Sequence, residues 1–421
     1  MEKFTFNVSE GKMTVNNDTG DSKSAASVAE NRDEGRVHYE GIVERQRKAS
    51  FRKKLIGGLA LIAVLLLGFF LLIMLRHYDN YEVLGTTKIK DASASKYEMF
   101  NGSLLKYGND GAILTDATGK VSWNVGYEMT APEIDMCDGY LIVYDRGGSR
   151  IYLLDGVGEV SEISTTQPIS KAEVSGAGTI AVIMKGELKS RIELYNKKGE
   201  TLASGELHIN NSGYPTDIAL SSGGQLLMVS SIGYEKGEVV SKISFYNFGN
   251  AGRNRIDNIV SSYKYKGTVI PEVDITDKGR PVAIGTDKII CYSTGNKPAE
   301  KSVIEPGEQM KSVIHNDKYI GFVVAEEGKD GVLQNTLKLY TYHGMKRYSK
   351  KLDFEYRDIK LMDDNEVMLT DGHKVNFISV LGMNRFFIND DEEIYDVVNK
   401  KAGREFYFVR SDSVQHVKLC N

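Results

Sequence analysis

From residue 79 to the C-terminus, hydrophobic and polar residues alternate in short runs that are separated by Gly, Asp and Asn. Alternation with a period of two is the pattern of a strand with one buried face, and glycine-containing pairs between such runs are typical of tight turns. The clearest unit, residues 133–163, reads as four strands joined by three turns. Similar units recur to the end of the chain, and the last one shows only three strands.

Four antiparallel strands in every stretch of about 40 residues are the signature of a β-propeller blade. An acidic residue opens the first strand of most units, and Ser312 takes its place in one of them. The acidic residues are Asp135, Glu173, Asp217, Asp274, Asp358 and Asp396. Their mean interval of about 44 residues divides residues 79–421 into seven or eight blades. The sequence therefore predicts an all-β fold, a β-propeller of seven or eight four-stranded blades, with eight favoured.

Two irregular stretches bear on how the ring of blades closes. An open ring would leave unpaired sheet edges at its two ends. The last unit lacks its fourth strand, and residues 81–93 (YEVLGTTKIKDAS) form a spare strand ahead of the first unit. We expect this N-terminal strand to complete the last blade. Residues 251–270 account for the one long interval between units.

Residues 55–75 (LIGGLALIAVLLLGFFLLIML) contain no charged residue. As a helix they span roughly 31 Å, which is close to the hydrocarbon thickness of a bilayer. Residues 45–54 hold six basic residues and no acidic one, whereas only Arg76 and His77 follow the apolar run before Asp79. The positive-inside rule therefore places the N-terminus in the cytoplasm. A cleaved signal peptide fits less well, because the apolar run is long and begins late in the chain.

The prediction for the whole chain is a single-pass protein of the cell membrane with three parts. Residues 1–54 form a disordered cytoplasmic tail with a basic juxtamembrane segment, because they are polar and short of aromatic residues. Residues 55–75 form the transmembrane helix, and residues 79–421 form an extracytoplasmic β-propeller.

Composition and motifs argue against several classes of function. The net charge of −4 excludes a globally basic nucleic-acid binder. Three scattered cysteines exclude a disulfide framework and a CxxC site. The sequence contains no GxSxG, HExxH, GxxxxGK[ST] or strand-following GxGxxG motif. It therefore predicts no catalytic residue, no cofactor, no metal ion and no nucleic-acid partner, so an enzyme is the less favoured class.

The acidic residues that open the first strands are the candidate binding residues. Innermost strands line the channel of a propeller, and their side chains alternate between the channel and the blade interior. If they share one face, five of them form a partial acidic ring at the channel mouth that takes a cation or a basic peptide: Asp135, Asp217, Asp274, Asp358 and Asp396. Alternatively, the carboxylates accept hydrogen bonds from the backbone of the neighbouring blade, which their recurrence in the repeat favours.

Residues 114–125 (LTDATGKVSWNV) resemble the repeat of quinoprotein-type, or PQQ-like, propellers. The matching positions are Asp116, Thr118, Gly119, Lys120 and Trp123. The resemblance implies that Gly119 makes the turn between the third and fourth strands and that Trp123 packs between blades. Trp123 is the only tryptophan, and there is no adjacent cysteine pair, so a quinone cofactor is not expected. The whole layout resembles an uncharacterised family of membrane-anchored propellers from low-GC Gram-positive bacteria, which has no assigned activity.

These observations favour a membrane-anchored extracytoplasmic propeller that binds or scaffolds a protein or an envelope polymer, in cell-envelope assembly or surface interaction. Two other classes stay open. One is a propeller-based enzyme acting on envelope carbohydrate or peptide. The other is a transmembrane sensor that reports the state of its outer domain to the cytoplasmic tail.

Overall fold

The computed structural model describes residues 51, 54–66, 68–69, 76–89, 92–116, 119–186, 189–208, 213–327, 331–400 and 404–421. The chain divides into two compact units, Met1–Arg76 and His77–Asn421. In the first unit, residues 54–66 and 68–69 are helical. Among the described residues, no helix is both long enough and apolar enough to cross a membrane. The predicted tail and residues 67 and 70–75 of the predicted span lie outside the described residues, apart from residues 51 and 54.

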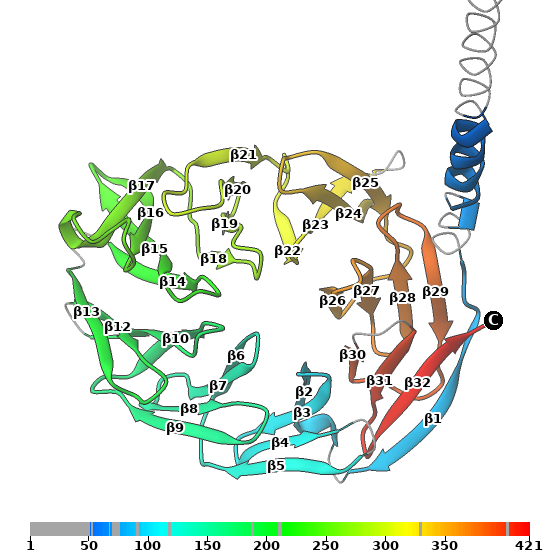
Figure 1. Ribbon diagram of the computed structural model, residues 1–421, viewed down its shortest axis with the longest axis horizontal. Helices are drawn as coiled ribbons and strands as arrows, with labels where there is room; N and C mark the ends of the chain where they lie inside the picture. Colours follow the sequence, from blue (N-terminus) through cyan, green and yellow to red (C-terminus); the bar gives the residue numbers. More distant parts are fainter. Residues whose placement is uncertain are drawn as a thin grey trace, which may run out of the picture. The chain divides into compact units, whose positions relative to one another are not determined.

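The second unit is an eight-bladed β-propeller (Figure 1). Blades 1 to 4 are β2–β5 (Lys96–Phe100, Ser103–Gly108, Gly111–Thr115, Val121–Gly126), β6–β9 (Pro132–Cys137, Tyr140–Asp145, Arg150–Leu154, Glu159–Ser164), β10–β13 (Ile169–Val174, Ile180–Met184, Lys189–Tyr195, Thr201–His208) and β14–β17 (Tyr214–Leu220, Leu226–Glu235, Glu238–Asn247, Ile259–Lys266). Blades 5 to 7 are β18–β21 (Glu272–Ile275, Pro281–Ile284, Ile289–Tyr292, Glu300–Ile304), β22–β25 (Met310–His315, Tyr319–Glu327, Leu333–Thr341, Lys346–Lys351) and β26–β29 (Asp358–Leu361, Val367–Thr370, Lys374–Ile378, Asn384–Asn389). Blade 8 is β30–β32 (Asp396–Asn399, Glu405–Val409, Ser413–Cys420) with β1 (Asn80–Lys88) as its fourth strand. The predicted fold class is confirmed, with eight blades.

β1 closes the ring, as the sequence predicted. It pairs antiparallel with β32 from Asn80 opposite Cys420 to Lys88 opposite Ser413, with one irregularity between Val83 and Gly85. The first and last segments of the propeller thus share one sheet, and no blade is left with three strands.

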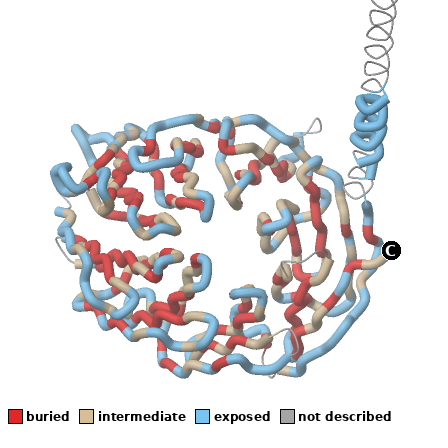
Figure 2. Tube along the Cα trace, viewed as in Figure 1, coloured by how far each residue is buried: buried red, intermediate tan, exposed pale blue. Residues whose placement is uncertain are grey.

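The core lies between neighbouring blades. Middle strands such as β11 are buried along their whole length, because both faces of each sheet are covered. Figure 2 shows buried residues along the middle strands and exposed residues at the outer rim. In the closing seam, the Phe377 ring lies 5.2 Å from that of Phe386 and 4.6 Å from that of Phe406 in blade 8, between centroids. Each such ring contributes about 1.5–3 kcal/mol through its burial.

Trp123 lies in the seam between the first two blades. Its side chain is buried, and its Nε1–H donates to the Asp155 carbonyl of blade 2 at 3.0 Å. Gly119 makes the preceding turn with a φ of 84°, and the Asp116 carboxylate accepts the Lys120 amide at 3.0 Å. Thr118 lies outside the described residues.

The long interval between units is an extended connection in blade 4. β16 ends at Asn247 and β17 begins at Ile259, and a short 3₁₀ turn, η2 (Ile256–Asn258), lies between them. A cavity of about 450 Å³ lies alongside this connection and β13. Ala203 in the fourth strand of blade 3 corresponds to Trp123 in the fourth strand of blade 1, because each residue pairs with its third strand just beside a β-bulge. Ala203 has no aromatic ring to fill the space between blades 3 and 4, so a cavity is left there.

Candidate functional site

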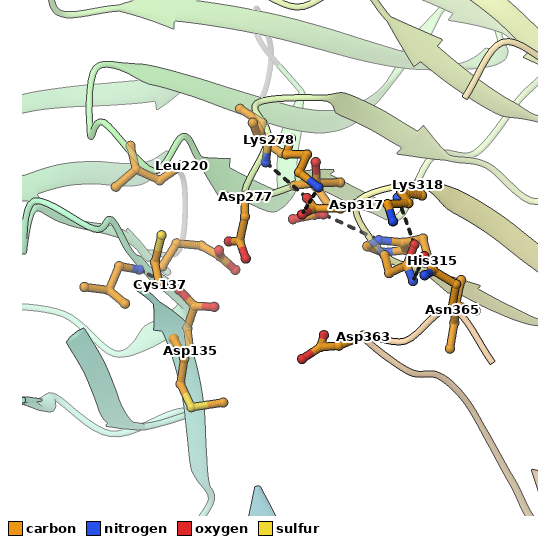
Figure 3. A pocket seen from close by; sticks show the side chains of 18 residues that line it. Asp135, Cys137, Leu220, Asp277, Lys278, His315, Asp317, Lys318, Asp363 and Asn365 are labelled. Carbon is orange, nitrogen blue, oxygen red and sulfur yellow. Dashed lines mark hydrogen bonds and ion pairs between the residues drawn. The ribbon is translucent and has the colours of Figure 1, made fainter. Parts of the chain in front are cut away.

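A group of charged side chains surrounds a cavity of about 440 Å³ at the mouth of the channel (Figure 3). It lies where the innermost strands of blades 2 to 7 end and turn into the second strands. Six acidic side chains line it: Asp135, Glu173, Asp274, Asp277, Asp317 and Asp363. Three basic residues accompany them: Lys278, His315 and Lys318. The mouth is therefore acidic, even though each strand alone carries only one or two charges.

Two of the predicted acids connect neighbouring blades. Asp135 Oδ2 accepts the Val174 amide of blade 3 at 2.6 Å, and Asp217 Oδ2 accepts the Val273 amide of blade 5 at 2.9 Å. Burial raises the pKa of each carboxyl to about 6, although these hydrogen bonds and the charge of Lys171 act in the opposite direction. Both side chains therefore help to hold neighbouring blades together, and the burial of their negative charge costs electrostatic free energy.

Lys171 is the main cation of this part of the channel. Its Nζ lies 3.1 Å from Glu173 Oε1 and 3.9 Å from Asp217 Oδ1. Burial alone lowers the pKa of Lys171, but the two carboxylates raise it overall. Burial raises the pKa of Glu173 well above its usual range; Asp135 adds to the shift and Lys171 opposes it. One ammonium group thus compensates several carboxylates incompletely.

His315 pairs with the acids of the neighbouring strand, β18. Its Nδ1 lies 3.5 Å from Asp274 Oδ2, and its Nε2 lies 4.0 Å from Glu272 Oε1. Burial lowers the pKa of His315, but the two carboxylates outweigh it and raise the pKa overall. The pKa of the Asp274 carboxyl is also raised, because its burial outweighs the opposing charge of the His315 imidazole.

The turns between first and second strands contribute further acidic side chains to the mouth. Lys278 Nζ lies 3.3 Å from Asp317 Oδ2, and the Lys278 amide donates to Asp317 Oδ1 at 3.1 Å. Asp277 and Asp363 point into the open space (Figure 3), and neither has a hydrogen bond or ion pair with another described residue. Burial raises the pKa of Asp277, and the charge of Asp317 raises it further.

The predicted acids do not all line the mouth. Asp135 and Asp274 lie within two residues of the end of their strands and line the mouth. Asp217, Asp358 and Asp396 lie three residues before the end of their strands and do not line this cavity. The five residues are not brought together in one ring.

Asp358 and Asp396 belong to a separate charged group between blades 7, 8 and 1. Lys360 Nζ lies 2.7 Å from Asp396 Oδ1 and 3.8 Å from Asp358 Oδ2. A second cavity of about 350 Å³ is lined by these residues and by Glu98. Burial raises the pKa of Glu98, and Lys360 partly offsets the shift.

The sequence interpretation missed Asp277, Asp317 and Asp363. All three lie in the turn after a first strand, where an acidic residue ordinarily accepts local backbone hydrogen bonds. The signal that could have identified them is an aspartate that recurs two residues after the first strand in three successive units.

The acidic side chains stand around the cavity without converging on a point. Among the residues that the structure describes, no three His, Cys, Asp or Glu side chains are arranged to hold a metal ion. A ring of separated carboxylates instead matches an ammonium or guanidinium group, which presents several N–H donors over a larger volume.

Comparison with known proteins relates the chain to others mainly by fold. No curated protein matches the sequence. The structure is similar to that of BamB from Moraxella catarrhalis, with a TM-score of 0.50 and 11% identity over 81% of this chain and 100% of that one. It is also similar to the computationally designed protein Ika8, with a TM-score of 0.51 and 10% identity over 82% of this chain and 99% of that one. Residues 74–419 match DUF5711, a family of unknown function. The chain therefore belongs to the DUF5711 family.

Proposed function

We propose that this protein is a membrane-anchored binding module displayed outside the cytoplasm, and that the mouth of its channel receives a cationic side chain of a partner protein. The uncharged stretch 55–75 and the basic residues before it support the anchor and its orientation. The proposal extends to a role in cell-envelope assembly or surface interaction, where such a module holds a partner at the membrane.

The observation that carries the proposal is the incomplete compensation of charge at the mouth. Six acidic side chains line the cavity against two lysines and one histidine. The raised pKa values of Asp135, Glu173 and Asp274 show that the anionic form of each carboxyl is disfavoured in the folded protein. An additional cation relieves this penalty, and charge-assisted hydrogen bonds form between it and the carboxylates.

The size of the cavity fits such a ligand. At about 440 Å³ it falls within the usual range of ligand pockets, roughly 300–1,000 Å³. A lysine or arginine side chain with its flanking residues fills such a volume better than a single metal ion does. The long aliphatic stems of these side chains also match apolar residues at the wall, such as Val174, Leu220 and Leu361.

The test is binding of fluorescein-labelled tetralysine to the full chain in detergent, followed by fluorescence anisotropy. We expect saturable binding that weakens with salt, and that strengthens from pH 5 to pH 8 because more of the carboxyls are then ionised. The double variant Asp277→Asn, Asp363→Asn should weaken binding at least tenfold without lowering stability, because neither carboxylate bonds to another described residue.

Asp391→Asn is the matched control, because Asp391 is an exposed acid in the connection between blades 7 and 8. Its affinity should equal that of the parent chain. Absence of saturable binding, or equal loss in the control and the double variant, would overturn the proposal. Binding of chitosan oligomers in preference to tetralysine would point instead to an amine-bearing envelope polymer.

A further inference from the structure

The two faces of the propeller differ in which turns they carry. Because the strands of each blade are antiparallel, the turns between first and second strands and those between third and fourth strands lie on one face, here called the proximal face. The other turns and the connections between blades lie on the distal face. β1 is a fourth strand, so its first residue, Asn80, lies at the proximal face. The acidic mouth opens on the same face, because its lining residues come from the turns after the first strands.

The chain is fixed to the proximal face before β1 begins. The His77 ring donates through Nδ1 to the Asn384 carbonyl at 3.0 Å, and the Tyr78 amide donates to the Arg385 carbonyl at 2.7 Å. Tyr78 forms a parallel bridge with Phe386 and is 3% exposed. Its ring lies under the guanidinium groups of Arg385, at 5.7 Å, and Arg404, at 5.1 Å.

This docking shortens the link to the predicted membrane span. Only Arg76 separates His77 from Leu75, the last residue of the apolar stretch. Two residues reach at most about 7 Å when fully extended. If the predicted span ends at Leu75, the chain leaves the bilayer within about 7 Å of the first fixed residue of the propeller.

Exposed apolar side chains project from the outer turns of this face. Val157 is 89% exposed, Ile256 87%, Met345 58% and Leu381 42%, and each lies in the connection between the third and fourth strands of a different blade. The distal face also exposes apolar residues, among them Tyr234 and Val332, at the tips of two long hairpins. Apolar exposure alone therefore does not distinguish the faces.

Charge does distinguish them. Among the described residues of the turns, acidic side chains outnumber basic ones about two to one on the distal face, whereas the two kinds are about equal on the proximal face. The distal excess includes the run from Asp390 to Glu393. The outer proximal turns carry exposed Lys197, Lys198, Arg253 and Arg255. An anionic lipid surface repels the distal face and attracts these outer turns.

We infer that the proximal face lies against the membrane, with its outer apolar and basic turns in contact with anionic phospholipid. This inference rests on the anchoring that the proposed function includes. Interfacial residues such as Val157, Met345 and Leu381 insert their side chains at headgroup level, and the exposed lysines and arginines in the outer turns of blades 3 and 4 bind lipid phosphate. The acidic mouth then faces the bilayer, so the cationic partner that reaches it lies at the membrane surface itself.

The test uses the full chain reconstituted into vesicles of phosphatidylcholine and phosphatidylglycerol. In a Cys420→Ser background, the other two cysteines are buried, so single cysteines at position 157, 345 or 381 accept an NBD label. Tyr234→Cys is the matched control, an exposed tip on the distal face. We expect lipids carrying a spin label near the headgroup to quench each proximal label at least twofold more than the control. Equal quenching at all four positions would overturn the inference.

A second measurement separates this inference from the anchoring. Alkaline extraction followed by flotation reports whether the chain stays in the vesicles. A chain that floats but shows equal quenching is anchored without resting its proximal face on the lipid, which rejects only the inference. A chain that is extracted is not integral, which rejects the anchoring and the inference together but leaves the binding of tetralysine as an independent result.

Discussion

Blades 2 to 5 and blades 7 and 8 use the acids of their innermost strands in different ways. In the first group Asp135 and Asp217 accept backbone amides of the following blade at 2.6 and 2.9 Å. In the second group Asp358 and Asp396 share the ammonium group of Lys360, which reaches from blade 7 to Asp396 of blade 8, and among the described residues neither carboxylate accepts a backbone amide of a neighbouring blade. Blades 7 and 8 are joined instead by the packed phenylalanine rings of their seam and by the N-terminal segment, through Tyr78 and β1.

This difference shows that one repeated residue can serve two purposes in a single ring. A carboxylate that accepts a backbone amide fixes the distance between two blades, whereas one that pairs with a flexible lysine does not. The closing seam is formed by segments from the two ends of the propeller, so its stability depends on them more than on its carboxylates.

The largest effect should come from removing the N-terminal segment. A chain that begins at Ser95 lacks β1 and the docked Tyr78, which leaves β32 with an unpaired edge and opens the apolar core of blades 7 and 8. We expect aggregation, or a melting temperature lower by more than 10 °C, since about 1 kcal/mol alone shifts it by a few degrees. Light scattering and calorimetry measure both. A monomeric chain of unchanged melting temperature would show that closure does not hold this seam.

Asp217→Ala should have the next largest effect. It leaves the buried Val273 amide without its acceptor and removes one of the carboxylates near Lys171, which should lower the free energy of unfolding by about 1–3 kcal/mol. Asp217→Asn keeps an oxygen in the same place and should lose much less. Denaturant titrations compare the two. Equal losses would mean that the charge, and not the hydrogen bond, holds the seam.

The pH dependence of stability should differ between the parent chain and Asp217→Asn. The pKa of Asp217 is raised to about 6 in the folded state, above its unfolded value, so the folded state favours the neutral form. Its contribution to stability is full below about pH 4 and is lost as the pH rises through about 6. The parent chain should therefore gain about 1–2 kcal/mol more than Asp217→Asn between pH 7.5 and pH 5. Parallel pH profiles in urea would refute the raised pKa.

The smallest effect is expected at Asp396. Its side chain and that of Lys360 are 24% and 35% exposed, and Asp358 stays near the same ammonium group. Asp396→Ala should therefore lower the free energy of unfolding by only about 0–1 kcal/mol. A loss as large as that of Asp217→Ala would remove the distinction between the two groups of blades.

The fold was predictable because each local signal repeats eight times. An error in one strand does not change the predicted fold, because the repeat period of all the units determines it. The N-terminal strand, for example, was predicted at residues 81–93 and is observed as β1 at Asn80–Lys88. The site was less predictable, because the cavity that a first-strand residue faces depends on how the blades are arranged around the channel. Asp274 of blade 5 lines the mouth, whereas Asp358 of blade 7 lines the second cavity together with Lys360, although Lys360, like Asp274, lies one residue before the end of its strand. Sequence alternation shows which face of a strand a residue occupies but not which cavity that face meets.

The most direct test of cation binding at the acidic mouth is the number of protons released when tetralysine binds the full chain. Titration calorimetry at pH 6.5 in buffers of different ionisation enthalpy measures this number. Acids whose pKa is raised by burial ionise when a cation arrives, so we expect a net release of protons that disappears in Asp277→Asn, Asp363→Asn along with tight binding. A binding heat that is the same in every buffer would mean that no mouth carboxyl changes its protonation when the cation binds, and would rule out charge compensation as the basis of binding.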